Sequence, residues 1–337
     1  MDADLPELCT RSRATDGQTP DLPYPSGWFC LAHSRELARG SVLTRQLAGE
    51  DVVLYRTGDG QSYAVHPYCP HLGAHLGVGG TIEGQNLVCP FHRFAFAPDG
   101  SCVGTPKGPH PRARLKHRTV RERNGFVIVW YGHDDTPPAW EIPDTSPPEV
   151  TVTATWATDV HAHVQELAEN GLDYRHLPAV HHVDVRQLVP PQAQGPYLRS
   201  HLRLGPNRPT ALKKIRYDVS FLLAGLGYVR AEIPVPPLGC ILHLWAVHAP
   251  TGPRLTRLLL GVACTDIQRT RPAGRTPLLR PVHRALARAV LWTAVSKAKD
   301  DVRIWNAKRY EPRPRLAAGD EAIGFYRHWA RQFYPTP

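Results

Sequence analysis

Two short motifs in the sequence each combine a cysteine with a histidine: Cys69-Pro70-His71 and Cys89-Pro90-Phe91-His92. Two thiolates and two imidazoles are ligands that proteins offer to zinc or to an iron–sulfur cluster. A single tetrahedral zinc ion is one interpretation of this set. The Cys-x-His spacing argues against zinc, because zinc fingers leave at least two residues between paired ligands. The prolines and glycines around both motifs instead favour loops that wrap a larger group.

The pattern of Cys-x-His, about seventeen residues and Cys-x-x-His resembles the Rieske [2Fe–2S] family. The resemblance implies that Cys69 and Cys89 bind one iron, and that His71 and His92 bind the other. Neutral imidazoles in place of two thiolates raise the reduction potential, so electron transfer is implied. Phe94 stands where many members of the family have tryptophan. The other cysteines are interpreted as plain thiols: Cys9, Cys30, Cys102, Cys240 and Cys264.

A second group of candidate ligands follows about eighty residues later. Asp173 and His176 are three residues apart, which predicts that they share one helix face. Pro178 is expected to end that helix, so that His181 can turn back toward His176. Two histidines and a distant carboxylate form the facial triad of Fe(II) oxygenases, which leaves coordination positions open for O2.

This segment resembles the Asn-x2-Asp-x2-His-x4-His pattern of Rieske oxygenase catalytic domains. The resemblance implies that His176 and His181 bind Fe(II), and His182 competes for the second position. Asn170 and Asp173 are the catalytic residues that the pattern implies. In the family the aspartate bridges the iron and the Rieske histidine of a neighbouring subunit, so a head-to-tail homotrimer is also implied.

The carboxylate of the triad is expected from a predicted helix over 282–308. Asp301 lies between Ala298 and Trp305 and interrupts the apolar stripe of this helix. A carboxylate on that face needs a partner, because an unpaired buried charge is costly. A salt-bridged surface acid is the alternative interpretation, and it suits Asp300 better. The Asp-x-x-Ile-Trp string resembles the third-ligand region of the family and favours Asp301.

The chain of 337 residues is long enough for about two domains. We expect an α+β protein in which an all-β Rieske domain precedes a helix-grip domain, an antiparallel sheet with helices. The expected boundaries are a flexible arm over 1–25, the Rieske domain over 26–132, a proline-rich linker over 133–150 and the catalytic domain over 151–337. The residue pattern predicts a hairpin over 51–66, a helix over 160–176, strands between 197 and 267, and helices over 282–308 and 319–334.

Composition limits the partners. The net charge is +10, but no run of five like charges indicates a nucleic-acid tract. No apolar stretch reaches the ~18–20 residues of a membrane span. The acidic start at Met1–Asp4 is not a secretory signal, and an odd cysteine count favours the cytoplasm. No Gly-x-Gly-x-x-Gly fingerprint is present, so electrons from NAD(P)H are expected through a separate flavin reductase or an acidic ferredoxin.

The C-terminal strings Ile304–Lys308 and Gly324–Tyr334 resemble the subgroup of 3-ketosteroid 9α-hydroxylases, cholesterol desaturases and aminopyrrolnitrin oxygenase. The resemblance implies an O2-dependent hydroxylation or desaturation of a bulky hydrophobic substrate, either steroid-like or a natural product. Arylamine N-oxygenation and O- or N-demethylation are alternatives within the same chemistry. A Rieske electron carrier, and a grip-fold module that has lost its iron, are alternatives outside it.

The substrate pocket is expected between residues 197 and 247. Apolar strand residues could face a bulky apolar substrate there, and burial of apolar surface would bind it with few polar contacts. The candidates are Phe221, Leu223, Leu242, Leu244 and Trp245. His243 or Asn170 could orient the substrate. The alternative for each is an ordinary core residue.

Overall fold

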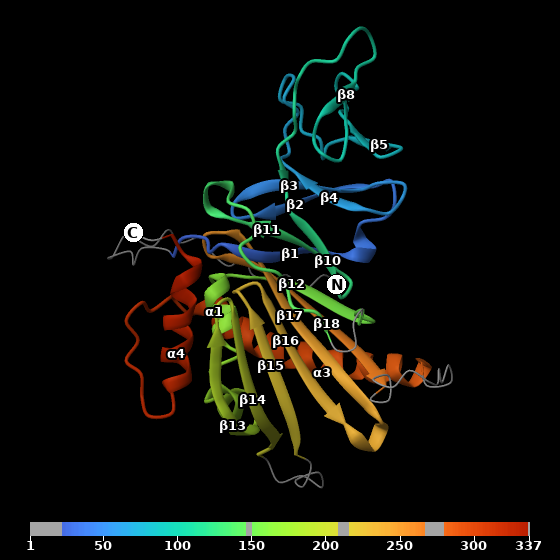
Figure 1. The fold of residues 1–337 in the computed structure, drawn as a ribbon. Helices are drawn as coiled ribbons and strands as arrows, with labels where there is room; N and C mark the ends of the chain where they lie inside the picture. The colour runs from blue at the N-terminus through green and yellow to red at the C-terminus, as the bar shows by residue number, and fades with distance from the viewer. Residues whose placement is uncertain (1–21, 146–149, 208–215, 267–279, 336–337) are drawn as a thin grey trace, which may run out of the picture.

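A computed structural model describes residues 22–145, 150–207, 216–266 and 280–335 (Figure 1). The N-terminal part consists of three small antiparallel sheets, and the C-terminal part of one seven-stranded antiparallel sheet with helices against it. The predicted α+β class, with an all-β part followed by a sheet gripped by helices, is therefore confirmed. The predicted arm falls mostly outside the described residues, as does part of the linker.

The N-terminal sheets contain short strands, as the frequent glycines and prolines predicted. Their orders are β1-β11-β10, β2-β3-β4-β9 and β5-β6-β7-β8. The strands are β1 Gly27–His33, β2 Val42–Leu47, β3 Glu50–Arg56, β4 Ser62–Val65, β5 Thr81–Glu83, β6 Asn86–Val88, β7 Ala95–Phe96, β8 Cys102–Gly104, β9 His117–Arg118, β10 Val120–Arg123 and β11 Phe126–Tyr131. The predicted hairpin is β3–β4, and its turn is closed by the Thr57 N–H, which donates to the Gln61 carbonyl at 3.0 Å.

The large sheet has the order β12-β18-β17-β16-β15-β14-β13. Strands β13 to β18 follow one another as a meander, and β12 closes the edge by pairing with β18. Their bounds are β12 Ala154–Val160, β13 Val183–Gln194, β14 Tyr197–Pro206, β15 Tyr217–Ala224, β16 Tyr228–Val235, β17 Cys240–Gly252 and β18 Leu255–Asp266. Figure 1 shows the N-terminal sheets above one end of this sheet.

The two faces of the large sheet pack against different parts of the chain. On β17, Trp245 and Val247 pack with Trp28 and Phe126 of the N-terminal three-stranded sheet. Side chains alternate between faces along a strand, so Ala246 points the other way, into the clusters that include the helices. The face that carries Ala246 is therefore the one available for a site built with the helices.

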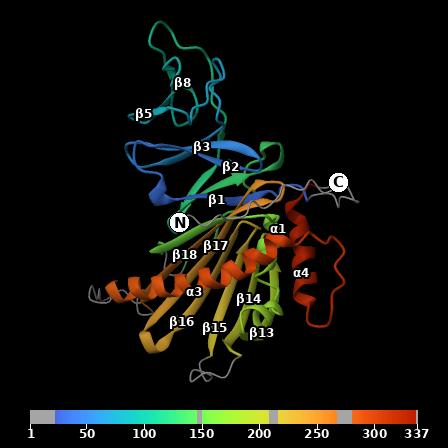
Figure 2. The ribbon, with the colours of Figure 1, turned by 180° about the vertical axis from the view of Figure 1, so that it is seen from behind.

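The C-terminal helices agree with the predictions, whereas the helices before the large sheet do not. The described α-helices are α1 Val164–Glu169, α2 His176–Val180, α3 Arg280–Ala307 and α4 Glu321–Ala330. The two predicted C-terminal helices are confirmed by α3 and α4. Figure 2 shows α3 crossing the strands of the sheet as one uninterrupted helix. None of the described helices is both long and apolar enough to span a membrane.

The predicted continuous helix over 160–176 is wrong. Strand β12 continues to Val160, and α1 begins only after His163, whose ring accepts a hydrogen bond from the Gln165 N–H at 3.2 Å. Pro178 does not end a helix either, because it lies in the first turn of α2. The first backbone N–H groups of a helix have no partner within it, so a proline is tolerated there.

Candidate metal centres

The first cysteine–histidine motif forms a tight loop at the end of the N-terminal part. The Cys69 N–H donates to the Ala74 carbonyl at 2.9 Å, and the Gly73 N–H donates back to the Cys69 carbonyl at 2.9 Å. Gly73 has a φ of +74°, a conformation that glycine adopts without steric cost. The loop thereby turns sharply while both ligand candidates stay near its tip.

The second motif repeats this backbone arrangement. The Cys89 N–H donates to the Phe94 carbonyl at 2.8 Å, and the Arg93 N–H donates to the Cys89 carbonyl at 3.1 Å. Arg93, four residues after the cysteine like Gly73 in the first loop, also has a positive φ of +56°. Two loops of the same backbone geometry therefore present one cysteine and one histidine each.

The two thiols are more deeply buried than the two imidazoles, of which His92 is half-buried. Cys69 and Cys89 are buried, whereas His71 is exposed and its ring centroid is 4.8 Å from that of His92. Burial, together with the adjacent Cys89 thiol, raises the pKa of Cys69 to about 11. Phe94 stacks on the His71 ring with centroids 4.3 Å apart. This arrangement fits a [2Fe–2S] cluster that has buried thiolate ligands and outward imidazoles.

The second constellation gathers three side chains from two helices. Donor atoms of His176, His181 and Asp301 all lie within 4.8 Å of one another, and in the described ranges no other group of three or more His, Cys, Asp or Glu side chains is this close. His181 Nε2 is 2.9 Å from Asp301 Oδ1. Two imidazoles and one carboxylate in this proximity fit a mononuclear Fe(II) site.

His176 is oriented by Asp173. Its Nδ1–H donates to the Asp173 carbonyl, and its backbone N–H donates to Asp173 Oδ1 at 3.3 Å. A metal-binding imidazole commonly donates one ring N–H to a carbonyl or carboxylate, which leaves the other nitrogen for the metal. His176 Nε2 is thus the free nitrogen. The prediction that Asp173 and His176 share a helix face is wrong, because Asp173 precedes α2 and caps it from outside.

Two further polar residues hold the group together. Asn170 Nδ2 donates to Asp301 Oδ2 at 3.3 Å. Lys297 Nζ donates to the His181 carbonyl at 3.2 Å, and burial lowers the pKa of this lysine. Lys297 was not among the residues predicted from the sequence, although its place one turn before Asp301 on the predicted helix is a usable signal.

The competing ligand candidates lie outside the group. His182 and Asp300 are exposed and line an open surface pocket of about 730 Å³ between α2 and α3. Their neighbours His181 and Asp301 have side chains only 4% and 11% exposed. His181 and Asp301 therefore differ from His182 and Asp300 both in burial and in proximity to His176.

Two predicted pocket residues point away from the triad. Trp245 packs against the N-terminal sheet, and His243 lies on the same face of β17. His243 is fully buried, and its Nε2 lies 2.9 Å from Thr265 Oγ1. Its Nδ1 faces Glu232 at 3.5 Å. Both residues occupy odd positions of β17, whereas Ala246 at an even position faces the helices, so neither side chain points toward the triad.

The other predicted pocket residues lie on the helix-covered face. Paired positions place Phe221, Ala231 and Leu244 in one row across β15, β16 and β17. All three remain half-buried at the centre of the sheet, whereas Leu223 and Leu242 are buried. These three side chains present an apolar surface on the helix-covered face of the sheet.

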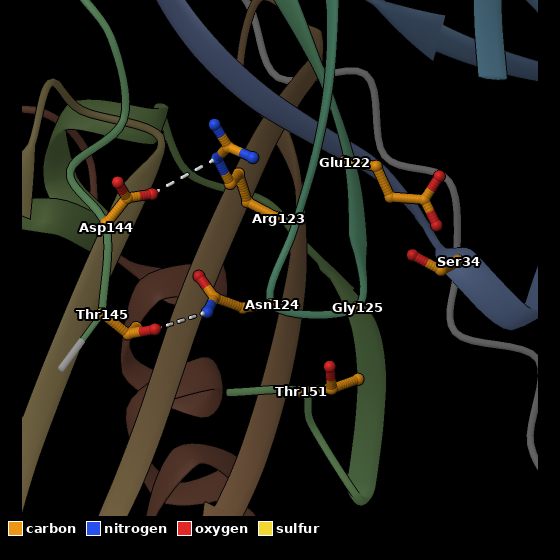
Figure 3. Close-up of a pocket in the computed structure, with 8 residues that line it drawn as sticks. All are labelled: Ser34, Glu122, Arg123, Asn124, Gly125, Asp144, Thr145 and Thr151. Carbon is orange, nitrogen blue, oxygen red and sulfur yellow. Dashed lines mark hydrogen bonds and ion pairs between the residues drawn. The ribbon is translucent and has the colours of Figure 1, made fainter. Parts of the chain in front are cut away.

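A separate cavity of about 530 Å³ lies where the N-terminal part meets the linker (Figure 3). It is lined mainly by polar side chains, including Glu122, Arg123 and Asp144. Asn124 donates to Thr145 Oγ1 at 3.3 Å and accepts from the Tyr228 hydroxyl at 2.9 Å. This cavity contains none of the triad residues, and its polar lining suits interdomain contact rather than an apolar substrate.

The fold and the two ligand groups define a class: Rieske non-haem iron oxygenases, in which a [2Fe–2S] domain precedes a catalytic domain. Residues 27–120 match the Rieske [2Fe-2S] domain, and residues 129–334 match the 3-ketosteroid 9alpha-hydroxylase C-terminal domain. The chain therefore belongs to the Rieske oxygenase family that includes cholesterol 7-desaturases and 3-ketosteroid 9α-hydroxylases. It is an oxidoreductase with a [2Fe–2S] cluster and non-haem iron as cofactors.

Known relatives agree with this membership. A cholesterol 7-desaturase of Bombyx mori is 33% identical over 337 residues, covering 93% of this chain and 70% of that protein. A probable 3-ketosteroid-9-alpha-monooxygenase, oxygenase component, of Rhodococcus rhodochrous is 27% identical, covering 96% and 83%.

Solved structures of the same fold are more distant in sequence. NdmA of Pseudomonas putida CBB5 with caffeine has a TM-score of 0.69 at 18% identity, covering 90% of this chain and 89% of that chain. Dicamba monooxygenase bound to dicamba has a TM-score of 0.64 at 18% identity, covering 91% and 96%. These two similarities show the fold alone.

Proposed function

We propose that this protein uses O2 to hydroxylate or desaturate a bulky, steroid-like apolar substrate. The observation that carries the proposal is the half-buried apolar row of Phe221, Ala231 and Leu244, which lies on the same face of the sheet as the triad. Each apolar Å² removed from water contributes about 25 cal/mol, so a large rigid ring system binds such a surface with few polar contacts. The named substrates of the sterol- and steroid-oxidising relatives agree with this choice.

We assign His176, His181 and Asp301 as the Fe(II) ligands, and Cys69, His71, Cys89 and His92 as the cluster ligands. When bound, the two metal groups supply electrons and activate O2. Asp173 holds His176 in the orientation that leaves Nε2 for the metal. Asn170 holds the second oxygen of Asp301. The apolar row holds the substrate beside the triad and excludes water.

Electron supply is proposed to come from NAD(P)H through a separate flavin reductase, a ferredoxin, or both. Apolar side chains are strongly exposed around the Rieske loops: Tyr68 61%, Leu72 67%, Val78 72% and Phe91 62%. Patches of this kind mark protein contacts. In Figure 1 these loops, near β5 and β8, lie at the end of the molecule away from α1 and α3. A head-to-tail homotrimer would bring the Rieske loops of one subunit to the triad of the next.

The proposed domain boundaries remain 26–132 and 151–337, joined by the linker over 133–150. A cytoplasmic location is proposed from the cysteine usage.

The test of this function compares two adjacent aspartates. Asp301→Ala should lose the mononuclear iron and all substrate oxidation, yet keep the Rieske EPR signal of the reduced protein. Asp300→Ala is the matched control and should retain both. Sterols, 3-ketosteroids and small aromatic acids are then offered to the wild-type protein with a reconstituted reductase, while O2 uptake and products are measured.

Loss of iron in Asp300→Ala but not in Asp301→Ala would refute the ligand assignment. Coupled oxidation of small carboxylates without any response to ring-fused apolar compounds would refute the proposed substrate class. Formation of an alkene or of an alcohol decides between desaturation and hydroxylation.

A further inference from the structure

The outward face of α3 carries a row of cations around one tryptophan. Arg284, Arg288, Lys299 and Arg303 are all exposed, and Trp292 is 76% exposed. At 3.6 residues per turn these five side chains fall within an arc of about 100°, and at 1.5 Å per residue the row is about 28 Å long. The row therefore forms one positively charged stripe along α3, the helix that crosses the sheet in Figure 2.

The cations of this row are not neutralised within the described part of the chain, where no ion pair involves any of the four. The helix contains two acids: Asp301 is buried in the metal group, and Asp300 is exposed but takes part in none of the ion pairs among the described residues. The row therefore accounts for part of the surplus of +10 charges in the chain and keeps its charge available to a partner.

Trp292 has both small and larger neighbours on the helix surface, with Arg288 and Val295 one turn away on either side. Ala289 and Thr293 are exposed beside it, and Ala285 lies two turns before it. The indole therefore stands above the helix surface instead of packing into a cluster. The inner face of α3 packs on β12 and β18, so the helix is held in place while its outer face stays uncovered by the described residues.

We propose that this face of α3 binds an anionic lipid surface, with Trp292 at the headgroup level and the four cations over lipid phosphates. Tryptophan prefers a membrane interface, where its apolar body and its polar N–H are both satisfied. Basic side chains near an anionic leaflet each add attraction, and a straight helix edge matches a flat surface. An acidic protein partner would satisfy the charges, but it would leave the protruding indole without a matching pocket.

Binding to lipid would give this face a purpose in the proposed function, because an apolar substrate partitions into lipid. The binding itself does not depend on the identity of the substrate. It is therefore measured with vesicles alone, so its failure and the failure of the proposed oxidation can be told apart.

The experiment is co-sedimentation of the full-length holoprotein with phosphatidylcholine vesicles, with and without phosphatidylglycerol. Binding is expected only with phosphatidylglycerol, and it should weaken as NaCl is raised. The Arg284→Glu/Arg288→Glu double variant should bind at least about tenfold more weakly than the wild type. The Arg186→Glu/Arg199→Glu variant makes the same charge change at exposed residues of β13 and β14, and should bind like the wild type.

Trp292→Ala should also weaken binding. The emission of Trp292 is obtained as the fluorescence of the wild type minus that of Trp292→Phe. Brominated lipid in the vesicles should quench this emission. The visible absorbance of the cluster checks that each variant is folded. Absence of binding to phosphatidylglycerol vesicles would overturn the proposal, as would equal losses in both double variants. If Arg284→Glu/Arg288→Glu kept vesicle binding but lost coupling to an acidic electron donor, the face would serve that protein instead.

Discussion

Asn170 and Asp301 are 131 positions apart in the chain, yet the amide of Asn170 donates to Oδ2 of Asp301 at 3.3 Å. The other oxygen of Asp301 faces His181 Nε2 at 2.9 Å. The carboxylate is therefore held on both sides, by the end of α1 and by the end of α2. Asn170 fixes the rotation of this carboxylate and does not merely fill space.

Asn170→Leu removes this hydrogen bond at similar volume. Fe(II) affinity should fall by about 10–100-fold, the usual effect of losing a hydrogen bond to a metal ligand. The measurement is an Fe(II) titration of protein from which the mononuclear iron has been removed, with the Rieske EPR signal as a check of folding. Asn306→Leu is the matched control, since Asn306 accepts from the His161 N–H and does not contact the triad. Equal affinities in the wild type and Asn170→Leu would show that the contact does not orient the ligand.

Asp173→Asn should separate metal binding from electron transfer. The variant keeps an oxygen that can accept from the His176 N–H, and the Asp173 carbonyl that holds the ring is unchanged. Both metals should stay bound. Oxidation of the reduced Rieske centre in a single turnover should slow by about 10–100-fold, if the carboxylate charge links the two centres. Stopped-flow absorbance follows this step, and a normal rate would exclude Asp173 from the transfer.

Lys297→Met should weaken iron binding without touching a ligand. Its ammonium group donates to the carbonyl of His181, which directly follows α2. A cation at a helix C-terminus stabilises the last carbonyl groups, so its loss frees the segment that carries His181. Fe(II) affinity should drop about tenfold in Lys297→Met and recover in Lys297→Arg. Lys299→Met, which is exposed, is the control; an equal drop there would point to overall charge instead of this contact.

His248 should make the protein less stable in mild acid. Burial lowers the pKa of His248 to about 4, and its Nδ1–H donates to the Leu226 carbonyl at 3.2 Å. The unfolded chain, in which histidine has a pKa near 6.5, takes up a proton between about pH 6.5 and 4, whereas the folded chain does not. Stability is therefore complete above pH 6.5 and falls as the pH is lowered toward 4.

The expected loss from His248 is about 2 kcal/mol of unfolding free energy between pH 7 and pH 5. Urea unfolding at both values measures it. His248→Asn, which can keep the donor, should lose less stability than the wild type over this interval. His33 and His66 also have pKa values lowered by burial and act in the same direction. They therefore contribute to the dependence of unfolding free energy on pH that remains in the variant. If His248→Asn lost as much unfolding free energy between pH 7 and pH 5 as the wild type, His248 would not be the source of the acid sensitivity.

The sequence was sufficient to predict the ligand candidates because they lie in short local patterns. Each Rieske pair sits in one loop, and His176 and His181 are five residues apart. Contacts between distant segments could not be read in this way. The hydrogen bond from Asn170 to Asp301 depends on the position of α1 relative to α3. The hydrogen bond from Lys297 to the His181 carbonyl depends on the position of α2 relative to α3.

The direction of side chains on β17 could not be predicted either. A strand with one solvent-exposed face has alternating polar and apolar residues, whereas a strand that is buried on both faces has a continuous apolar run. The N-terminal sheet covers one face of β17, and the other lies toward the helices. Trp245 and Leu244 thus look equivalent in the sequence, although only Leu244 lies on the triad face.

The separation of the triad from the apolar row has an evolutionary consequence. The triad stands on α2 and α3, while Phe221, Ala231 and Leu244 stand on strands of the sheet. Substitutions in the strands can therefore change this apolar surface while the residues of the triad and their hydrogen bonds remain unaltered. Such an enzyme can acquire a new substrate by neutral drift at a few strand positions, without passing through a form that has lost its oxidative chemistry.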